Sequence, residues 1–128
     1  MRYQDYLDAY NHPDEGAKAR FFTEDCKFQL GELKVEGRDA MLAMFANGHI
    51  GVKEELRPLH VLETEGYIFA ELDACFMPFE DTPQNFFHPF KRGEPLSFRF
   101  FASYEIRDDR ISFMRLAHWP APSVIEPF

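Results

Sequence analysis

The sequence predicts an α+β domain in which short helices come first and an antiparallel sheet follows. In the N-terminal part, apolar residues recur three and four positions apart, which is typical of helices with one buried face. In the C-terminal part they alternate with polar residues, as in strands with one buried face. With 128 residues, 45% of them hydrophobic, the chain can bury one sizeable core. We therefore expect a single domain over residues 1–128.

Three helices are expected before the sheet. The first is the aromatic stretch YQDYLDAY, which ends before Pro13, because proline cannot continue a helix but suits the first turn of the next one. The second, PDEGAKARFF, has its acidic residues at the end that the helix dipole favours. A strand in CKFQL follows. The third helix, EGRDAMLAMFANGH, has Asp39 to cap its start and Gly48 to end it.

Four strands are expected after the helices. They are ELRPLHVLETEG, YIFAELDACFM, LSFRFFASYEIR and, after a tight turn at Asp108 and Asp109, RISFMRLAHW. A long loop or extended hairpin at 78–95 separates the second and third of them. It carries four phenylalanines, which are unfavourable in water and so must contact something. The segment is therefore expected to cover a cavity, to pack across a dimer seam or to extend a hairpin.

Charge and composition argue against several partners and sites. The 14 basic and 22 acidic residues give a net charge of −8, which disfavours nucleic acid and anionic membranes. The sequence shows no signal peptide and no apolar run long enough to span a bilayer, so a cytoplasmic location is expected, with Cys26 and Cys75 as free buried thiols. The five histidines lack metal-ligand spacing. We expect neither a metal site nor a cofactor.

A family resemblance rests on three stretches: FFTEDCKFQLG, VEGRDAMLAMFANGH and the closing hairpin SFRFFASYEIRDDRISFMRLAHW. They resemble segments of the nuclear transport factor 2-like superfamily, which includes SnoaL-like and ketosteroid isomerase-like domains. The resemblance spans residues 3–119, apart from 78–95. It implies a cone-shaped barrel in which three N-terminal helices pack on a curved antiparallel sheet. Because this superfamily includes many chemistries and non-enzymes, the resemblance implies a fold more than an activity.

The catalytic pattern of ketosteroid isomerase is only partly present. The resemblance places its oxyanion tyrosine on Tyr6. Its general-base aspartate falls on Leu30 and its second aspartate on Ala102, neither of which can exchange a proton. The acid that several relatives carry on the last strand falls on Leu116. Isomerisation by that mechanism is therefore not expected.

Three residues are the candidates for catalysis: His118, Asp73 and Tyr6. Alternation places His118 on the face of Met114 and Leu116, which the resemblance turns toward a cavity, although a histidine at a strand end is often simply solvated. The resemblance turns Asp73 inward, as the counterpart of an aspartate in limonene epoxide hydrolase. The hydrophobic pattern of its own strand turns it outward instead.

Further residues are candidates for ligand binding. His60 lies near a catalytic histidine of scytalone dehydratase and shares one alternating face with Leu56 and Leu62, so it is expected to point inward. Tyr104 alternates with Phe98 and Phe100 and could present its hydroxyl to a ligand, or pack in the core. The remaining candidates are apolar and would line the cavity: Phe100, Met114, Leu116 and Leu30.

The expected function is the binding of a hydrophobic or aromatic small molecule in an apolar pocket. If the protein is an enzyme, the chemistry expected is cofactor-free isomerisation, dehydration or cyclisation. The alternative is a non-catalytic module of the same fold that binds a ligand or a protein. In either case a homodimer through the outer face of the sheet is expected, because many relatives pair there and Phe101, Phe113 and Trp119 offer apolar surface.

Overall fold

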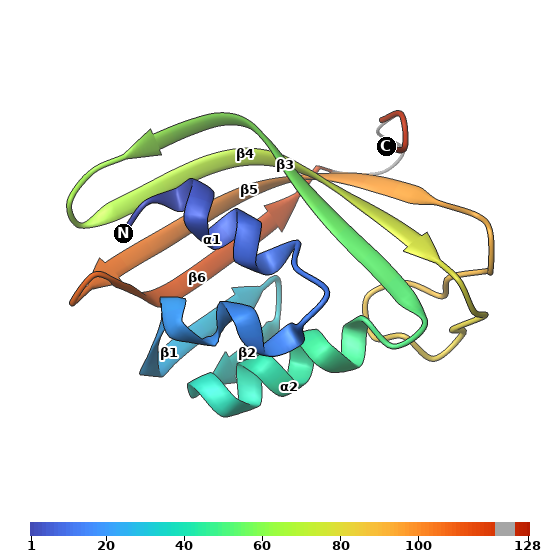
Figure 1. The fold of residues 1–128 in the computed structure, drawn as a ribbon, viewed down its shortest axis with the longest axis horizontal. Coiled ribbons are helices and arrows are strands. Elements are labelled where there is room, and N and C mark those ends of the chain that lie inside the picture. The colour runs from blue at the N-terminus through green and yellow to red at the C-terminus, as the bar shows by residue number, and fades with distance from the viewer. Residues whose placement is uncertain (120–124) are drawn as a thin grey trace.

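The computed structural model describes residues 1–119 and 125–128 and confirms the α+β class. Its helices are α1 (Tyr3–Tyr10), the 3₁₀-helix η1 (Glu15–Phe21) and α2 (Arg38–Gly48). The first strands are β1 (Phe22–Leu30), β2 (Leu33–Glu36) and β3 (Val52–Glu63). The later ones are β4 (Tyr67–Pro78), β5 (Leu96–Arg107) and β6 (Arg110–His118). Figure 1 shows α1 and α2 in front of one face of the sheet.

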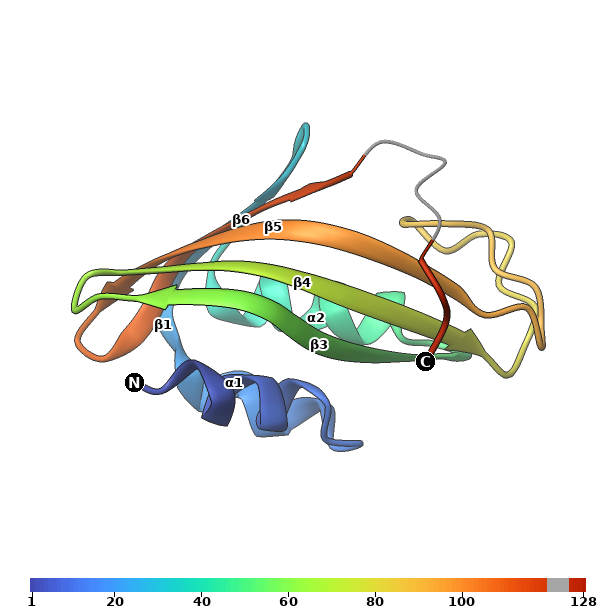
Figure 2. The same ribbon diagram turned by 90° about the horizontal axis from the view of Figure 1, so that it is seen from above.

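The sheet is open and mixed, whereas a cone-shaped barrel with a curved antiparallel sheet was expected. Its six strands follow the order β2-β1-β6-β5-β4-β3, so β2 and β3 form two free edges. β1 runs parallel to β6, whereas the other neighbours are antiparallel. The long strands curve over the two helices (Figure 2). This curvature encloses an inner face, which carries the core, and leaves an outer face open.

An aromatic cluster fixes α1 to the sheet. Tyr3, Tyr6 and Tyr10 repeat at helical spacing and are all buried. The ring of Tyr6 packs edge-on against Phe22 of β1 and Tyr104 of β5, with centroid distances of 5.6 and 5.8 Å. Such rings contribute both buried area and favourable edge-to-face contacts. The cluster fills the space between α1 and the sheet as far as the last turn of the helix.

A β-bulge in β3 changes the face of the sheet to which every second residue points. The pairing with β4 shifts between Pro58 and His60, leaving Leu59 as an extra residue. Before the bulge, Leu56 is paired with Ala74 and is buried on the inner face. After it, His60 is paired with Glu71 and is exposed on the outer face. The bulge therefore turns His60 to the outer face, although the alternation in the sequence places it on the same face as Leu56.

Residues 79–95 form an irregular loop at one end of the sheet (Figure 2). A single isolated bridge, Thr82 to Phe90, crosses it. Phe90 is buried, and Phe87 stacks on Phe76 of β4 with a centroid distance of 5.0 Å. The side-chain amide of Asn85 donates to the carbonyl of Gly48 at 2.8 Å, which joins the loop to the end of α2.

Both cysteines are free and buried, and burial raises the pKa of the Cys26 thiol to about 11. The Cys26 thiol is therefore not a ready nucleophile. Within the described part of the chain, no helix combines the length and the apolar character that crossing a bilayer requires.

Candidate functional site

A cavity of about 60 Å³ lies between the inner face of the sheet and α2. We call it the inner cavity. Ten of its lining residues are aromatic, aliphatic or glycine: Phe28, Leu30, Met44, Phe45, Gly48, Phe76, Phe86, Phe87, Phe100 and Leu116. The three remaining lining residues carry polar groups: Tyr10, His49 and Glu54. An apolar cavity with a few convergent polar groups is the usual form of a small-molecule site.

The polar groups of the cavity belong to one hydrogen-bonded cluster. The Nε2 atom of His49 lies 2.7 Å from Oε2 of Glu54, and its Nδ1 atom lies 2.5 Å from Oε1 of Glu15. The hydroxyl of Tyr10 donates to the same Oε2 of Glu54 at 2.8 Å. Lys18 donates to the other oxygen of Glu15, also at 2.8 Å. We call these five residues the His49 cluster.

Four different elements position the cluster. Tyr10 ends α1, Glu15 and Lys18 lie on η1, and Glu54 lies in the first half of β3. His49 follows α2, and its backbone N–H donates to the carbonyl of Phe45 at 3.1 Å, so the end of the helix fixes the imidazole. The cluster therefore exists only in the folded chain.

The contacts of His49 favour its charged form. Ionised carboxylates only accept hydrogen bonds, so an imidazole between two of them donates from both nitrogens. Burial lowers the pKa of His49, but the hydrogen bond and charge of Glu54 and the charge of Glu15 outweigh it, and the pKa is raised. Burial raises the pKa of Glu15, but the contacts with Lys18 and His49 outweigh it, and the pKa is lowered.

Lys18 balances the charge of the cluster. Its side chain is 1% exposed, and its ammonium lies 4.3 Å from the centre of the Tyr10 ring. A buried ammonium is costly unless it is paired, and here Glu15 and the aromatic ring face compensate that cost. With His49 protonated, two cations and two carboxylates lie together. Burial and the charge of Glu54 also raise the pKa of Tyr10, so its hydroxyl stays protonated.

His118 lies beside Phe87 of the 79–95 loop and is not part of the wall of the inner cavity. It is paired with Phe100 at the end of β6, and the two rings are 6.0 Å apart. The side chain is exposed, and Nδ1 lies 3.1 Å from the carbonyl oxygen of Trp119. The ring of Phe87 lies 6.3 Å from the imidazole of His118. Phe87 lines the inner cavity, whereas His118 does not.

Asp73 and His60 both lie on the outer face, which is the side that the hydrophobic pattern of its strand predicts for Asp73 and the opposite of the side expected for His60. Asp73 is opposite Arg99 and accepts two hydrogen bonds from it, at 2.8 and 3.0 Å. The alternation of β4 places Asp73 there, because Leu72 and Ala74 occupy the core face. His60 is turned outward by the bulge, and its side chain is 83% exposed.

Tyr6 and Tyr104 are core residues that line none of the cavities described here. The hydroxyl of Tyr104 shares a 2.8 Å hydrogen bond with that of Tyr3, and the Tyr6 hydroxyl donates to Sδ of Met114 at 3.8 Å. Burial raises the pKa of both Tyr6 and Tyr104 well above the ordinary range. Met114 is buried beside them. The other apolar candidates lie in the wall of the inner cavity: Leu30, Phe100 and Leu116.

The residues named as catalytic candidates therefore do not converge, and sequence reasoning missed the cluster that does. One signal was available. Val52, Glu54 and Leu56 alternate on one face of β3, and a carboxylate on an otherwise apolar face requires a partner. Nothing in the sequence indicates that this partner is His49. Among the described residues, no group of three or more His, Cys, Asp or Glu is arranged to hold a metal ion.

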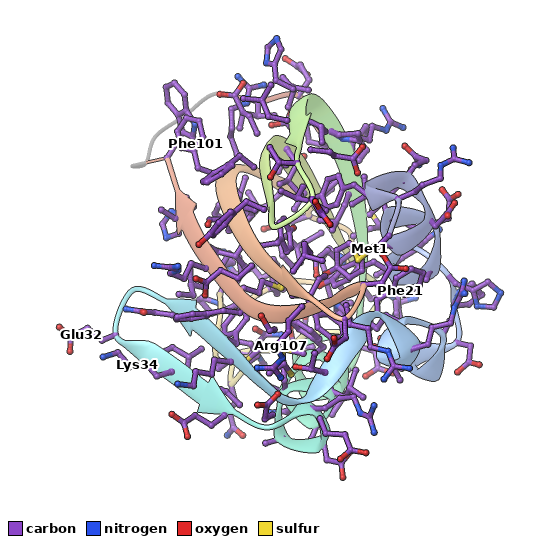
Figure 3. The ribbon with its side chains drawn as sticks, turned by 90° about the vertical axis from the view of Figure 1, so that its left-hand side faces the viewer. Met1, Phe21, Glu32, Lys34, Phe101 and Arg107 are labelled. Carbon is purple, nitrogen blue, oxygen red and sulfur yellow. The ribbon has the colours of Figure 1, made fainter. Side chains whose placement is uncertain are left out.

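A second hollow, of about 730 Å³, lies on the outer face of the sheet. Large apolar side chains around it are exposed, among them Leu62, Phe69 and Phe101. Figure 3 shows Phe101 on the side of the sheet opposite Phe21. This hollow is wide and shallow, and it is separated from the His49 cluster by the sheet.

Comparison with known proteins identifies the family. A provisionally named polyketide cyclase from Xanthomonas campestris pv. campestris has 21% identity and a TM-score of 0.77, over 90% of this chain and 85% of that one. An LEH-like epoxide hydrolase from M. tuberculosis has 13% identity and a TM-score of 0.72, over 91% and 79%. A Catenulispora acidiphila protein with a ketosteroid isomerase-like fold, in complex with trimethylamine, has 10% identity and a TM-score of 0.72, over 94% and 85%.

At these identities the structures show a shared fold alone. No curated protein matches the sequence. The family model described as SnoaL-like domain matches residues 3–114, which is most of the chain. The chain belongs to the SnoaL-like domain family.

Proposed function

We propose that this protein binds a hydrophobic or aromatic small molecule in the inner cavity and acts on it without a cofactor, as an isomerase, dehydratase or cyclase. One observation carries the proposal: Tyr10, His49 and Glu54 form a polar wall in an otherwise apolar cavity. Such a wall supplies protons and hydrogen bonds but no nucleophilic thiol. The chemistry that it supports is proton transfer.

The family supports the same direction. Relatives of the same fold are named as a polyketide cyclase and an epoxide hydrolase, and both names refer to reactions of small organic molecules. By the resemblance, the two catalytic aspartates of the ketosteroid isomerase pattern fall on Leu30 and Ala102, which cannot exchange a proton. The acid–base groups proposed for this chain therefore come from the end of α1, the end of α2 and β3.

Ligand entry requires the 79–95 loop to move. A volume of about 60 Å³ holds only a few water molecules, whereas small-molecule sites usually measure about 300 Å³ or more. Phe86 and Phe87 come from the loop and line the cavity. Swinging these two rings outward opens the cavity at the end where His118 stands. His118 thus remains a candidate for contact with a ligand at the rim.

A cavity-filling variant tests the binding. Met44 lines the cavity, whereas its neighbour Ala43 is exposed on α2. We expect 2-naphthol and 2-tetralone to bind the wild type in calorimetric titrations and to perturb the amide signals of cavity residues. Met44→Trp should abolish that binding and Ala43→Trp should retain it. Binding that survives Met44→Trp would place the ligand elsewhere, and no binding by any variant would favour the non-catalytic interaction module.

We also propose that two copies pair through the outer face. Leu62 is 70% exposed and Phe101 is 51% exposed, and Trp119 stacks on Phe101 with a centroid distance of 5.6 Å. The same face carries both signs of charge, with Glu71 beside the apolar side chains and Arg115 across from it, which suits a twofold partner. Light scattering should give twice the chain mass. Phe101→Glu should give a monomer that still binds cavity ligands, and a monomeric wild type would refute the pairing.

A further inference from the structure

We propose that Glu54 is the group that exchanges a proton with the molecule in the inner cavity, and that His49 and Glu15 pass protons between Glu54 and solvent. The substrate class is an apolar carbonyl compound with an acidic C–H beside the carbonyl. This inference rests on the proposed function and names the reacting group within it. Glu54 is the catalytic residue, and His49 is a positioning residue.

The position of Glu54 is the first support. Its side chain is 11% exposed and lines the inner cavity together with the apolar side chains of the sheet. His49 and Tyr10 both donate to Oε2. Within residues 1–119 and 125–128, no hydrogen bond reaches Oε1. The carboxylate is therefore held in place through one oxygen, while the lone pairs of the other are free for a ligand proton.

The second support is that the cluster separates two compartments. Tyr10, His49 and Glu54 line the inner cavity and also line a surface cleft of about 520 Å³, which Glu15 shares. The exposed fraction rises from 11% at Glu54 and 13% at His49 to 41% at Glu15. A chain of three acid–base groups thus runs from the cavity to water through contacts of 2.7 and 2.5 Å. Protons can pass along it without opening the cavity to bulk solvent.

Charge balance explains why all three groups act together. The groups that face His49 are Tyr10 of α1, Glu15 and Lys18 of η1, and Glu54 of β3. When Glu54 takes a proton its charge is lost, and the imidazolium loses one of its two carboxylate partners. Its Nδ1 proton then passes to Glu15 and on to solvent. The proton that Glu54 gains raises the net charge of the cluster by one, and the release of the imidazolium proton through Glu15 to solvent restores the original charge, so the buried site does not keep an uncompensated ion.

The chemical step follows from this arrangement. The Glu54 carboxylate takes a proton from the carbon beside the ligand carbonyl. The C–H electron pair becomes the C=C bond of an enolate, and the carbonyl π pair moves to oxygen. Returning the proton to another carbon completes an isomerisation. A carboxylate can remove a proton from carbon when a neighbouring group accepts the electron pair, and a carbonyl is such an acceptor, which is why we name a carbonyl compound as the substrate class.

The probe is 5-nitrobenzisoxazole, an apolar aromatic molecule whose ring opening needs only a base. The base takes the ring C–H proton, that electron pair forms the nitrile, and the N–O bond breaks to leave a coloured phenolate. We expect the wild type to bind the probe and to open it. Glu54→Gln should lower kcat/KM about 100-fold or more while the probe still binds. Glu55→Gln, on the opposite face of β3, is the matched control and should leave the rate unchanged.

The dependence of kcat/KM on pH shows whether His49 and Tyr10 position Glu54 or only stabilise the fold. His49→Gln removes the cation beside Glu54, so the acidic limb of the profile should move to higher pH. Tyr10→Phe removes a hydrogen bond to the same carboxylate and should move the limb in the same direction, which gives an independent result if Glu54→Gln does not fold. Binding with an unchanged rate in Glu54→Gln, or with an unmoved limb in both other variants, refutes the inference alone. If neither the wild type nor Phe87→Ala binds the probe, the proposed function fails with it.

Discussion

The ring of Phe86 covers Gly48 so closely that a methyl group on this glycine would lie 2.9 Å from Cε1 of the ring. The ring is 48% exposed and can turn outward, so Gly48→Ala should displace it and loosen the 79–95 loop. We expect faster hydrogen exchange at the backbone N–H of Phe87, which donates to Asn85. The global free energy of unfolding should change by less than about 1 kcal/mol, because alanine favours the helix by a similar amount.

Gly66→Ala is the control for this experiment, since a Cβ there would have no atom within 4 Å. Exchange at Phe87 should match the wild type in that variant. Equal exchange in Gly48→Ala and Gly66→Ala would mean that the Phe86 contact does not hold the loop.

His49 should make stability depend on pH. Its pKa is raised on folding, so its contribution is full below about pH 6.5, the unfolded value, and is lost as the pH rises through the folded value. We expect the stability advantage of the wild type over His49→Gln to shrink with rising pH, by at most about 1.4 kcal/mol per pH unit. Urea unfolding from pH 6 to 9 measures it. A pH-independent difference between the two proteins would show that His49 is uncharged in the fold.

The Tyr3–Tyr104 hydrogen bond should stabilise the core without affecting the cavity. Tyr104→Phe leaves the buried hydroxyl of Tyr3 without its partner and should cost about 1–2 kcal/mol of unfolding free energy. Removing both hydroxyls should cost less than the sum of the single changes, because neither is then orphaned. Ligand affinity should be unchanged in each variant. Weaker binding in Tyr104→Phe would instead support the sequence-based assignment of Tyr104 as a ligand contact.

Phe87→Ala should enlarge the inner cavity. The ring packs against Phe76, Phe98 and Phe100, with centroid distances of 5.0, 5.1 and 6.0 Å, so its removal should cost about 3 kcal/mol of stability. In return, aromatic ligands with two fused rings should bind more rapidly in stopped-flow measurements. Phe79→Ala, in the same loop but 57% exposed, should change neither quantity. Association at the wild-type rate in Phe87→Ala would exclude this ring as the gate.

The sequence carries most of the information about elements and little about their neighbours. Periodicity located α1, α2 and the four C-terminal strands, because burial of one face imposes a repeat on each element. The parallel pairing of β1 with β6 joins distant segments, and no local pattern records it. In the sequence, Leu56, Pro58, His60 and Leu62 alternate without interruption. In the structure, the bulge at Leu59 places the last two on the opposite face of the sheet from the first two.

The site was harder to predict for the same reason. Family register pointed to Tyr6, whereas the hydroxyl in the cavity wall belongs to Tyr10, one helical turn later on the same stripe. His49 looked like an ordinary residue after a helix, and Glu54 like one of several acids on a strand. Their significance comes from a contact of 2.7 Å between elements that the sequence does not place relative to one another.

The parallel seam between β1 and β6 also decides when this chain can fold. During synthesis β1 leaves the ribosome long before β6, and its apolar residues Phe22 and Phe28 then lack the strand that will cover their flank. Because β6 lies between β1 and β5, the β1–β2 hairpin and the β3–β5 meander cannot form one continuous sheet until β6 has been synthesised. A nascent chain stalled before Arg110 therefore has two separate pieces of sheet with an unpaired strand edge on each, which favours aggregation and chaperone binding, and the last strand completes the sheet.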